Sequence, residues 1–296
     1  VAVGRMVYTQ WLNDRGGIEA DVTVTRLSEQ RFLVVSGVAC QNRDMDWLAR
    51  NKLKDGLVVI TDMTSAMAVV TVMGPKSRET LAKLTQADMS NEAFPFASSQ
   101  EIDMHYAVVR ASRITYVGEL GWELYIPTEY APSVYDAVCE AGEEFGIRPY
   151  GYHTMNSLRM EKMYRAWGNE FTEEISGVEA GMGRFIDSSR DFIGVEVVRE
   201  REKNGGEIQL AYLAFDDDIA CEVFGNESVF HDGEHIGLTT GGAYGFRVGH
   251  SLAFAYIKPE LVVQGTQLQV QTSHGMRWAH IEMDAVYDPE NKLLRS

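Results

Sequence analysis

From about residue 205 onward, glycine-containing turns divide the chain into short β-rich runs, and this pattern restricts the possible folds most. The turns contain Gly205-Gly206, Gly225-Asn226, Asp232-Gly233, Gly241-Gly242 and Gly265. The runs beside them are 208–215, 228–230, 235–239, 251–257, 267–272 and 277–286. Short strands separated by frequent turns are typical of barrels and sandwiches. We therefore predict an all-β C-terminal domain over residues 203–296.

Residues 1–202 instead mix strand and helix patterns. A turn cluster at 13–17 predicts a hairpin between strands 5–12 and 18–25. Further strands are predicted at 32–36, 57–60, 66–73 and 104–115, and helices at 43–53, 76–84, 129–145 and 153–164. Thr128 is expected to cap the third helix and Gly146 to end it. The mixture predicts an α+β fold rather than a βαβ nucleotide-binding domain.

The composition limits the partners of the chain. With 45% hydrophobic and 24% charged residues, the 296 residues suit a soluble globular protein without a membrane segment. The 43 acidic residues outnumber the 27 basic ones and give a net charge of −16. We expect no nucleic-acid partner, because binding phosphates requires clustered cations. The chain begins at Val1 in strand-like sequence, so we also expect that an N-terminal part of the first domain is missing.

The three cysteines indicate the compartment. Cys40, Cys139 and Cys221 lie far apart and form no CxxC pair. A disulfide framework is therefore not expected, and we predict a reducing compartment. This would be the cytoplasm, or the mitochondrial matrix in a eukaryote.

Several familiar catalytic motifs are absent or out of context. There is no GxxxxGK[ST], and Gly181-Met182-Gly183 does not extend to GxGxxG. The GxSxG-like segment 249–253 continues into a β-rich run, whereas a nucleophile elbow needs a following helix. His231 and His235 flank a turn without a third nearby ligand, which favours a surface hairpin over a metal site. No metal site is predicted.

Two carboxylates on strands are candidate functional groups. Glu123 follows the glycine-containing turn 116–121, and alternation places it opposite the apolar face of its strand. A carboxylate offers two adjacent acceptors that match the amidine-like edge of a pterin or guanine. Asp21, on the polar face of another strand, can stabilise a cationic centre or orient a nucleophilic amine. Spacing alone leaves open that each is a solvated strand residue.

The segment 157–170 is a second dense patch of polar and aromatic residues. Arg159 and Lys162 lie three residues apart and share a helix face. Glu161 and Arg165 have the i,i+4 spacing of an ion pair at a solvated helix end. Tyr164 and Trp167 can alternatively form part of the wall of a ligand pocket.

These patches together resemble the folate-dependent aminomethyltransferase family, whose type member is the T-protein of the glycine cleavage system. The resemblance lies in Gly16-Gly17-Ile18 followed by Asp21, in Tyr116–Glu123, and in Ser157-Leu158-Arg159. Phe192-Ile193-Gly194, Gly249–Ala253 and Tyr287-Asp288-Pro289 fit the C-terminal barrel of the same family. The family implies a folate-binding region of mixed sheets and helices over residues 1–202, followed by a β-barrel over 203–296.

Within that family, Glu161-Lys162 to Trp167-Gly168 is most similar to the C-terminal part of dimethylglycine and sarcosine dehydrogenases. In those enzymes a flavin domain oxidises an N-methyl group, and the C-terminal part passes the one-carbon unit to tetrahydrofolate, giving 5,10-methylenetetrahydrofolate. The resemblance implies tetrahydrofolate as cofactor and an N-methylated amine, or its iminium, as small-molecule substrate. FAD would act only through a flavin-dependent dehydrogenase domain or subunit outside this chain.

The resemblance also implies the roles of individual residues. Asp21 would be the catalytic acid near the reacting folate nitrogens. Glu123 would hold the pterin edge, and Tyr116 would line the pocket. The remaining cofactor-binding residues would come from the segment 157–170: Arg159, Tyr164 and Trp167.

One departure from the family pattern concerns Met155. The glycine-cleavage enzymes have a folate-contacting arginine two residues before the Ser-Leu-Arg run, and Met155 takes that place here. This agrees with the dehydrogenase branch. Two alternative functions are direct methyl transfer to tetrahydrofolate by a demethylase of the family, and a non-catalytic folate-binding or assembly domain.

Overall fold

The N-terminal segment forms a three-stranded antiparallel sheet in the computed structural model, which describes residues 1–54 and 56–296. Strands β1 (Met6–Leu12), β2 (Ile18–Arg26) and β3 (Phe32–Val35) lie in this order, and helix α1 (Gln41–Asn51) follows. The predicted hairpin between β1 and β2 is confirmed. Its turn requires glycine at position 17, because a Cβ there would lie 1.9 Å from the carbonyl oxygen of Glu173.

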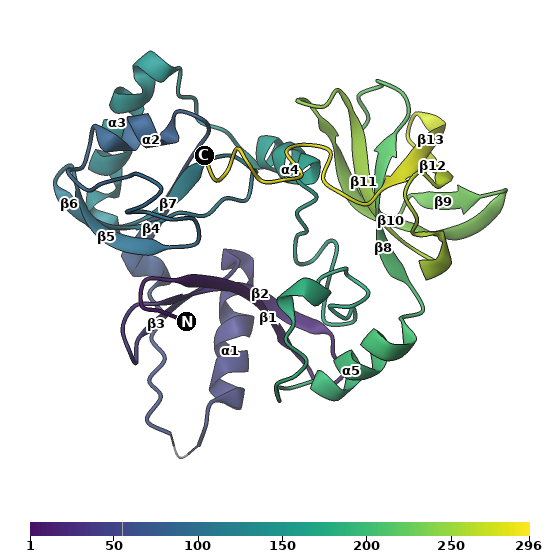
Figure 1. Cartoon of the computed structure of the whole chain (residues 1–296), viewed down its shortest axis with the longest axis horizontal. Coiled ribbons are helices and arrows are strands. Elements are labelled where there is room, and N and C mark those ends of the chain that lie inside the picture. Colours follow the sequence, from purple (N-terminus) through teal and green to yellow (C-terminus); the bar gives the residue numbers. More distant parts are fainter. Residues whose placement is uncertain (55) are drawn as a thin grey trace.

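A second, four-stranded antiparallel sheet carries its strands in the order β4-β7-β6-β5. These are β4 (Met67–Met73), β7 (Gly121–Pro127), β6 (Ala107–Ser112) and β5 (Ser99–Met104). Helices α2 (Ser77–Ala82) and α3 (Ala131–Gly142) cover one face (Figure 1). Trp122, Leu124 and Ile126 of β7 are fully buried in the core beneath these helices. The predicted alternation along β7 is therefore confirmed, since Glu123 lies on the other face.

Six antiparallel strands close into a C-terminal barrel in the order β10-β11-β8-β13-β12-β9. Their bounds are Gln209–Phe215 (β8), Ser228–His231 (β9), Glu234–Gly245 (β10), His250–Ile257 (β11), Gln267–Thr272 (β12) and Gly275–Glu282 (β13). Apolar side chains from alternating positions fill its interior. The predicted α+β region followed by an all-β barrel is thus confirmed.

Two helices and a C-terminal tail connect the barrel with the sheets. Helix α4 (Tyr152–Glu161) lies between the four-stranded sheet and the barrel, and α5 (Val195–Asn204) precedes β8 (Figure 1). The predicted boundary between residues 202 and 203 falls inside α5. After β13 the tail returns to the four-stranded sheet (Figure 1), where the carbonyl oxygen of Ser296 accepts hydrogen bonds from Arg78 (2.9 Å) and Arg113 (3.1 Å). None of the helices in the described part of the chain is long and apolar enough to cross a membrane.

Some local predictions were wrong. Residues 57–60 form no strand, because this exposed apolar run meets no partner strand. The strand predicted at 104–115 is instead the second half of a β5–β6 hairpin, whose turn contains His105 at φ +54°. The hydroxyl of Thr128 donates to the carbonyl oxygen of Ser65 rather than capping α3. Strand β5 and helix α5 were not predicted.

Candidate functional site

A cavity of about 1250 Å³ lies where the two sheets, the segment after α4 and the C-terminal tail meet. Its wall contains five of the six residues predicted to form the site: Asp21, Tyr116, Glu123, Tyr164 and Trp167. This volume exceeds the range of about 300–1,000 Å³ usual for pockets that bind drug-sized ligands. The cavity therefore has room for a ligand of that size together with a second small molecule.

Asp21 reaches the cavity from the middle of β2, where it lies opposite Gln10 of β1. Its carboxylate accepts a hydrogen bond from the hydroxyl of Tyr8 at 3.1 Å. Burial raises the pKa of Asp21, and the hydrogen bond from Tyr8 opposes part of that rise. Burial likewise raises the pKa of Tyr8, so this hydroxyl remains a donor. Tyr8, which the sequence interpretation did not single out, thus orients the carboxylate.

Glu123 enters the cavity from the opposite sheet, because alternation on β7 turns it away from the core. Its carboxylate accepts a hydrogen bond from the hydroxyl of Tyr125, two residues further along the same strand face, at 2.5 Å. Burial raises the pKa of Glu123, and the contact with Tyr125 partly offsets this. No ion pair of Glu123 is present among residues 1–54 and 56–296. A half-buried carboxylate with spare acceptor capacity can receive N–H donors from a ligand.

Aromatic side chains form the wall next to Asp21. The rings of Tyr116 and Tyr164 are stacked with their centroids 6.1 Å apart. The hydroxyl of Tyr116 donates to the backbone carbonyl of Arg165 at 2.9 Å. The indole N–H of Trp167 donates to the carbonyl of Ile18 at 2.8 Å, which ties the wall to β2. These contacts hold the aromatic rings in place in the cavity wall, and the guanidinium of Arg43 covers one face of Trp167 at 3.7 Å.

Arg159, the sixth predicted residue, occupies a different position. It is 2% exposed and donates to the carboxylate of Glu170 (2.8 Å), the side chain of Asn156 (2.8 Å) and the carbonyl of Tyr164 (3.0 Å). It lines a smaller pocket of about 370 Å³, which adjoins the large cavity and shares four lining residues with it: Tyr116, Tyr152, Met155 and Ala166. The guanidinium therefore holds the loop after α4 in position by bonding to the backbone of Tyr164.

The predicted ion pair between Glu161 and Arg165 is wrong. Glu161 is fully buried and pairs with Arg247 of the barrel, whose backbone N–H also donates to it at 2.7 Å. The local pattern failed because α4 ends at Glu161, so Arg165 is not on the same helix. Arg165 instead lines the cavity.

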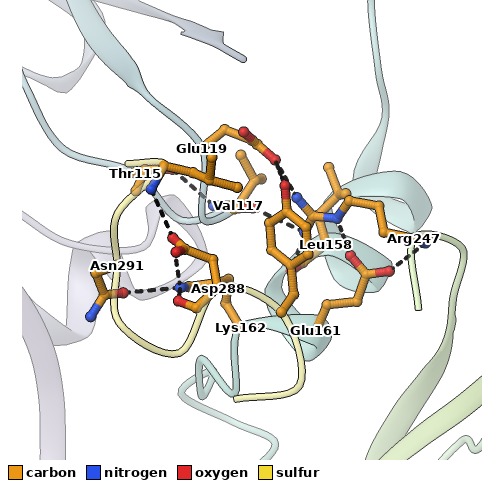
Figure 2. A network of polar contacts seen from close by, with 11 residues as sticks. Thr115, Val117, Glu119, Leu158, Glu161, Lys162, Arg247, Asp288 and Asn291 are labelled. Atoms are coloured by element: carbon orange, nitrogen blue, oxygen red, sulfur yellow. Dashed lines mark hydrogen bonds and ion pairs between the residues drawn. The ribbon is translucent and has the colours of Figure 1, made fainter. Parts of the chain in front are cut away.

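Arg247 belongs to a junction of polar contacts between the four-stranded sheet, α4, the barrel and the tail (Figure 2). Its guanidinium donates to Glu119 at 2.5 Å and stacks on the ring of Tyr287 at 3.6 Å. Figure 2 shows Lys162 directed towards the tail, where it donates to the carbonyl of Asp288 (2.6 Å) and the amide oxygen of Asn291 (2.9 Å). The sequence interpretation gave Glu119 no role. The partners of Glu119, which are Arg247 and Tyr287, are far from it in the sequence and contact it only in the folded chain.

Ser251 of the GxSxG-like segment and the histidines of the possible metal site are ordinary parts of the barrel. The buried hydroxyl of Ser251 accepts from the N–H of Cys221 (3.1 Å) and donates to the carbonyl of that residue (3.0 Å) within the barrel. His231 and His235 lie on the hairpin formed by β9 and β10, as predicted. The described part of the chain contains no group of three or more His, Cys, Asp or Glu side chains suited to a metal ion.

Comparison with known proteins gives consistent matches over both parts of the chain. The model of the GCVT N-terminal domain matches residues 1–190, and that of the glycine cleavage T-protein C-terminal barrel domain matches residues 209–288. The crystal structure of the glycine cleavage system aminomethyltransferase T from Bartonella henselae has the same fold, with a TM-score of 0.86. That match covers 98% of this chain and 78% of the other at 21% identity.

Two curated relatives are much longer than this chain. The mitochondrial dimethylglycine dehydrogenase of Homo sapiens is 36% identical over 273 residues, which cover 91% of this chain and 31% of that protein. The 4-methylaminobutanoate oxidase (formaldehyde-forming) of Paenarthrobacter nicotinovorans is 33% identical over 298 residues, covering 100% and 36% respectively. The chain thus spans about a third of the length of these relatives.

Proposed function

The chain belongs to the glycine cleavage T-protein family of folate-dependent aminomethyltransferases, and from this premise we propose that it transfers a one-carbon unit to tetrahydrofolate. The product would be 5,10-methylenetetrahydrofolate. The donor would be an N-methyl glycine derivative of the dimethylglycine or sarcosine type, oxidised by a flavin domain or partner. The names of the two longer relatives, a dimethylglycine dehydrogenase and a formaldehyde-forming methylaminobutanoate oxidase, support this class of donor.

The observation that carries the proposal is the half-buried carboxylate of Glu123 in the cavity wall. Its pKa is raised because burial removes water that would solvate the charge, and Tyr125 supplies one hydrogen bond in return. A pterin edge presents adjacent ring N–H and amino donors, which would satisfy the remaining acceptors. The residues therefore fit tetrahydrofolate, and Glu123 would bind and orient its pterin end.

The chemistry would take place beside Asp21. Tetrahydrofolate supplies the two nucleophilic nitrogens that receive the carbon. The negative charge of Asp21 would stabilise the positive charge of an incoming iminium carbon. The carboxylate would then accept the proton that the first attacking nitrogen loses as the new C–N bond forms. It would return this proton to the donor amine, which leaves when the second folate nitrogen closes the methylene bridge. Its raised pKa makes it a stronger base than a solvated aspartate, and Tyr8 keeps it oriented towards the cavity.

The aromatic wall has a separate part in the proposal. Tyr116 and Tyr164 would stack against the planar portion of the ligand and exclude water from the reacting atoms. Trp167, fixed by its hydrogen bond to β2, would keep this wall at a constant distance from Asp21. Exclusion of water matters because an iminium carbon also reacts with water, and the one-carbon unit would then be lost as formaldehyde.

Product analysis tests this proposal. The chain is incubated with tetrahydrofolate and limiting formaldehyde as a one-carbon donor, and folates are identified by mass spectrometry. We expect 5,10-methylenetetrahydrofolate to form faster than in the spontaneous reaction without protein. With a methylated sulfonium or ether as donor, formation of 5-methyltetrahydrofolate would instead support direct methyl transfer. Folate binding without any acceleration would indicate a non-catalytic binding domain.

A further inference from the structure

One half-buried cation in the cavity wall, Arg165, has no carboxylate at ion-pair distance in the described part of the chain. The guanidinium of Arg165 makes a single hydrogen bond, from Nη1 to the carbonyl of Met163 at 3.3 Å. Its Nε is buried without any partner. Among residues 1–54 and 56–296, no carboxylate forms an ion pair with it. A buried charged donor left unpaired costs free energy, so this arrangement indicates a partner that comes from outside the chain.

The surroundings of Arg165 keep the guanidinium in this place. On one side it lies over the ring of Phe254, at 5.7 Å from the ring centre. On another side it packs against the backbone at Gly181, where an added Cβ would lie 3.0 Å from Nη2. Gly181 has φ +66°, a conformation that favours glycine. The fold thus reserves space for the guanidinium, and the carboxylate of Glu170, which acts on it through its charge, forms its ion pair with Arg159 instead.

Two other arginines of the same region, Arg159 and Arg43, do have carboxylate partners. Arg159, six residues earlier, is fully engaged by Glu170, Asn156 and a backbone carbonyl. Arg43, also in the cavity wall, pairs with Asp44 at 3.0 Å. In a chain with 43 acidic and 27 basic residues, counter-ions for arginine are abundant. Arg165 differs from these two arginines, because its one hydrogen-bond acceptor is a backbone carbonyl.

A second arginine adds positive charge to this part of the cavity. Arg184 lines the cavity, is exposed, and makes no ion pair within the described part of the chain. Burial, and to a smaller extent the charge of Arg184, lower the pKa of Arg165, so the two cations act on the same space. Like charges that share a cavity repel each other unless an anion lies between them.

We propose that Arg165, assisted by Arg184, binds a carboxylate group of a ligand in the cavity. A guanidinium presents parallel N–H donors that match the two oxygens of a carboxylate. Tyr116, which donates to the backbone of Arg165, connects this position with the aromatic wall next to Asp21. The inference rests on the proposed function, because both concern ligands of the same cavity. The carboxylate belongs either to the amino-acid donor or to the glutamate of tetrahydrofolate.

Calorimetric titration distinguishes these sources. The ligands are tetrahydrofolate, a tetrahydropterin without the benzoylglutamate tail, N,N-dimethylglycine, and trimethylamine, which lacks the carboxylate. They are titrated into the wild type and into Arg165→Gln, Arg165→Lys and Arg184→Gln. Arg190→Gln is the matched control, because Arg190 is exposed and lies outside the cavity wall. Arg184→Gln keeps the test valid if Arg165→Gln does not fold, since the side chain of Arg184 is exposed.

We expect Arg165→Gln to lower the affinity for a ligand that carries a carboxylate by about 10- to 100-fold. The loss of affinity should be smaller for Arg165→Lys and for Arg184→Gln. The affinities for the tail-free pterin and for trimethylamine should change by less than about twofold in these variants. The control variant should bind every ligand within about twofold of the wild type. A loss confined to tetrahydrofolate assigns the site to its glutamate, and a loss confined to dimethylglycine assigns it to the donor. Unchanged affinity for both carboxylate ligands would overturn the inference, while wild-type binding of tetrahydrofolate would still support the proposed function. If the wild type binds neither pterin but binds dimethylglycine through Arg165, the proposed function fails and the carboxylate site stands.

Discussion

The molecule contains one region of buried charge and one of half-buried charge, and the two are organised in opposite ways. At the junction between α4, the barrel and the tail, acids meet bases directly: Glu161 pairs with Arg247, and Glu170 pairs with Arg159. In the cavity wall, three charged groups have no ion-pair partner among residues 1–54 and 56–296. Asp21 and Glu123 each face a tyrosine hydroxyl, and Arg165 faces a carbonyl.

We interpret the paired charges as structural and the unpaired charges as functional. A buried ion pair compensates its own desolvation through the partner, so the junction can fix one element against another without a ligand. An isolated buried charge has no such compensation and weakens the folded state until a ligand supplies the missing partner. The cavity groups therefore cost stability in the empty protein and provide binding energy or chemistry when it is filled.

The largest expected effect comes from breaking the junction. Glu170 is fully buried and accepts hydrogen bonds from Arg159 (2.8 Å), the N–H of Ala166 (2.7 Å) and Thr240 (3.2 Å). Glu170→Ala should lower the free energy of unfolding by about 3–5 kcal/mol, because Arg159 is left as an unpaired buried charge. Urea unfolding measures this loss.

The control for that experiment is an exposed ion pair. Glu101 pairs with Arg110 at 2.6 Å, and its side chain is 64% exposed. Glu101→Ala should change the free energy of unfolding by about 1 kcal/mol or less. Equal losses for the two variants would show that burial does not distinguish the junction from the surface.

A smaller effect, on binding rather than stability, is expected at Glu123. Glu123→Ala should weaken tetrahydrofolate binding by about 1.5–3 kcal/mol, because charge-assisted hydrogen bonds to the pterin edge are lost. The variant should be no less stable than the wild type, since it removes a desolvated charge. Calorimetry at constant pH measures the affinity, and undiminished affinity would place Glu123 outside the ligand contacts.

The smallest effect concerns pH. Burial raises the pKa of both Asp21 and Glu123 in the folded state. Their contribution to stability is therefore fully present below their unfolded pKa values of about 4 and is lost as the pH rises through the higher folded values. The double variant Asp21→Asn/Glu123→Gln should gain stability relative to the wild type as the pH rises from about 4 towards 8. Urea unfolding across this range would show a constant difference if the two acids were ordinary solvated residues.

Local sequence patterns predicted the parts of the fold that depend on neighbours in the chain. The alternation along residues 121–127 correctly separated Trp122 and Leu124 from Glu123, because a strand has a period of two residues. The turns after residue 205 correctly indicated an all-β domain, and the family resemblance specified the barrel that the structure shows. The run 57–60 was mispredicted because strand formation also needs a partner, which local sequence cannot show.

The candidate site was predicted less completely, for the same reason. Asp21 and Glu123 were identified by their strand positions and by the family resemblance, and both do face one cavity. The unpaired state of Arg165 was not visible, because its apparent partner Glu161 pairs with a residue 86 positions away. Whether a charge is satisfied depends on long-range contacts, so sequence spacing assigned this pair incorrectly.

The most direct test compares the affinity, turnover and stability of Asp21→Asn with those of the wild type. Asparagine keeps the size of the side chain and removes its charge and basicity. Our account predicts that formation of 5,10-methylenetetrahydrofolate falls by about 10²- to 10⁴-fold, while tetrahydrofolate affinity and the urea midpoint at neutral pH do not decrease. Unchanged turnover, or a loss of stability comparable to that of Glu170→Ala, would contradict it, because Asp21 would then be a structural residue of the fold.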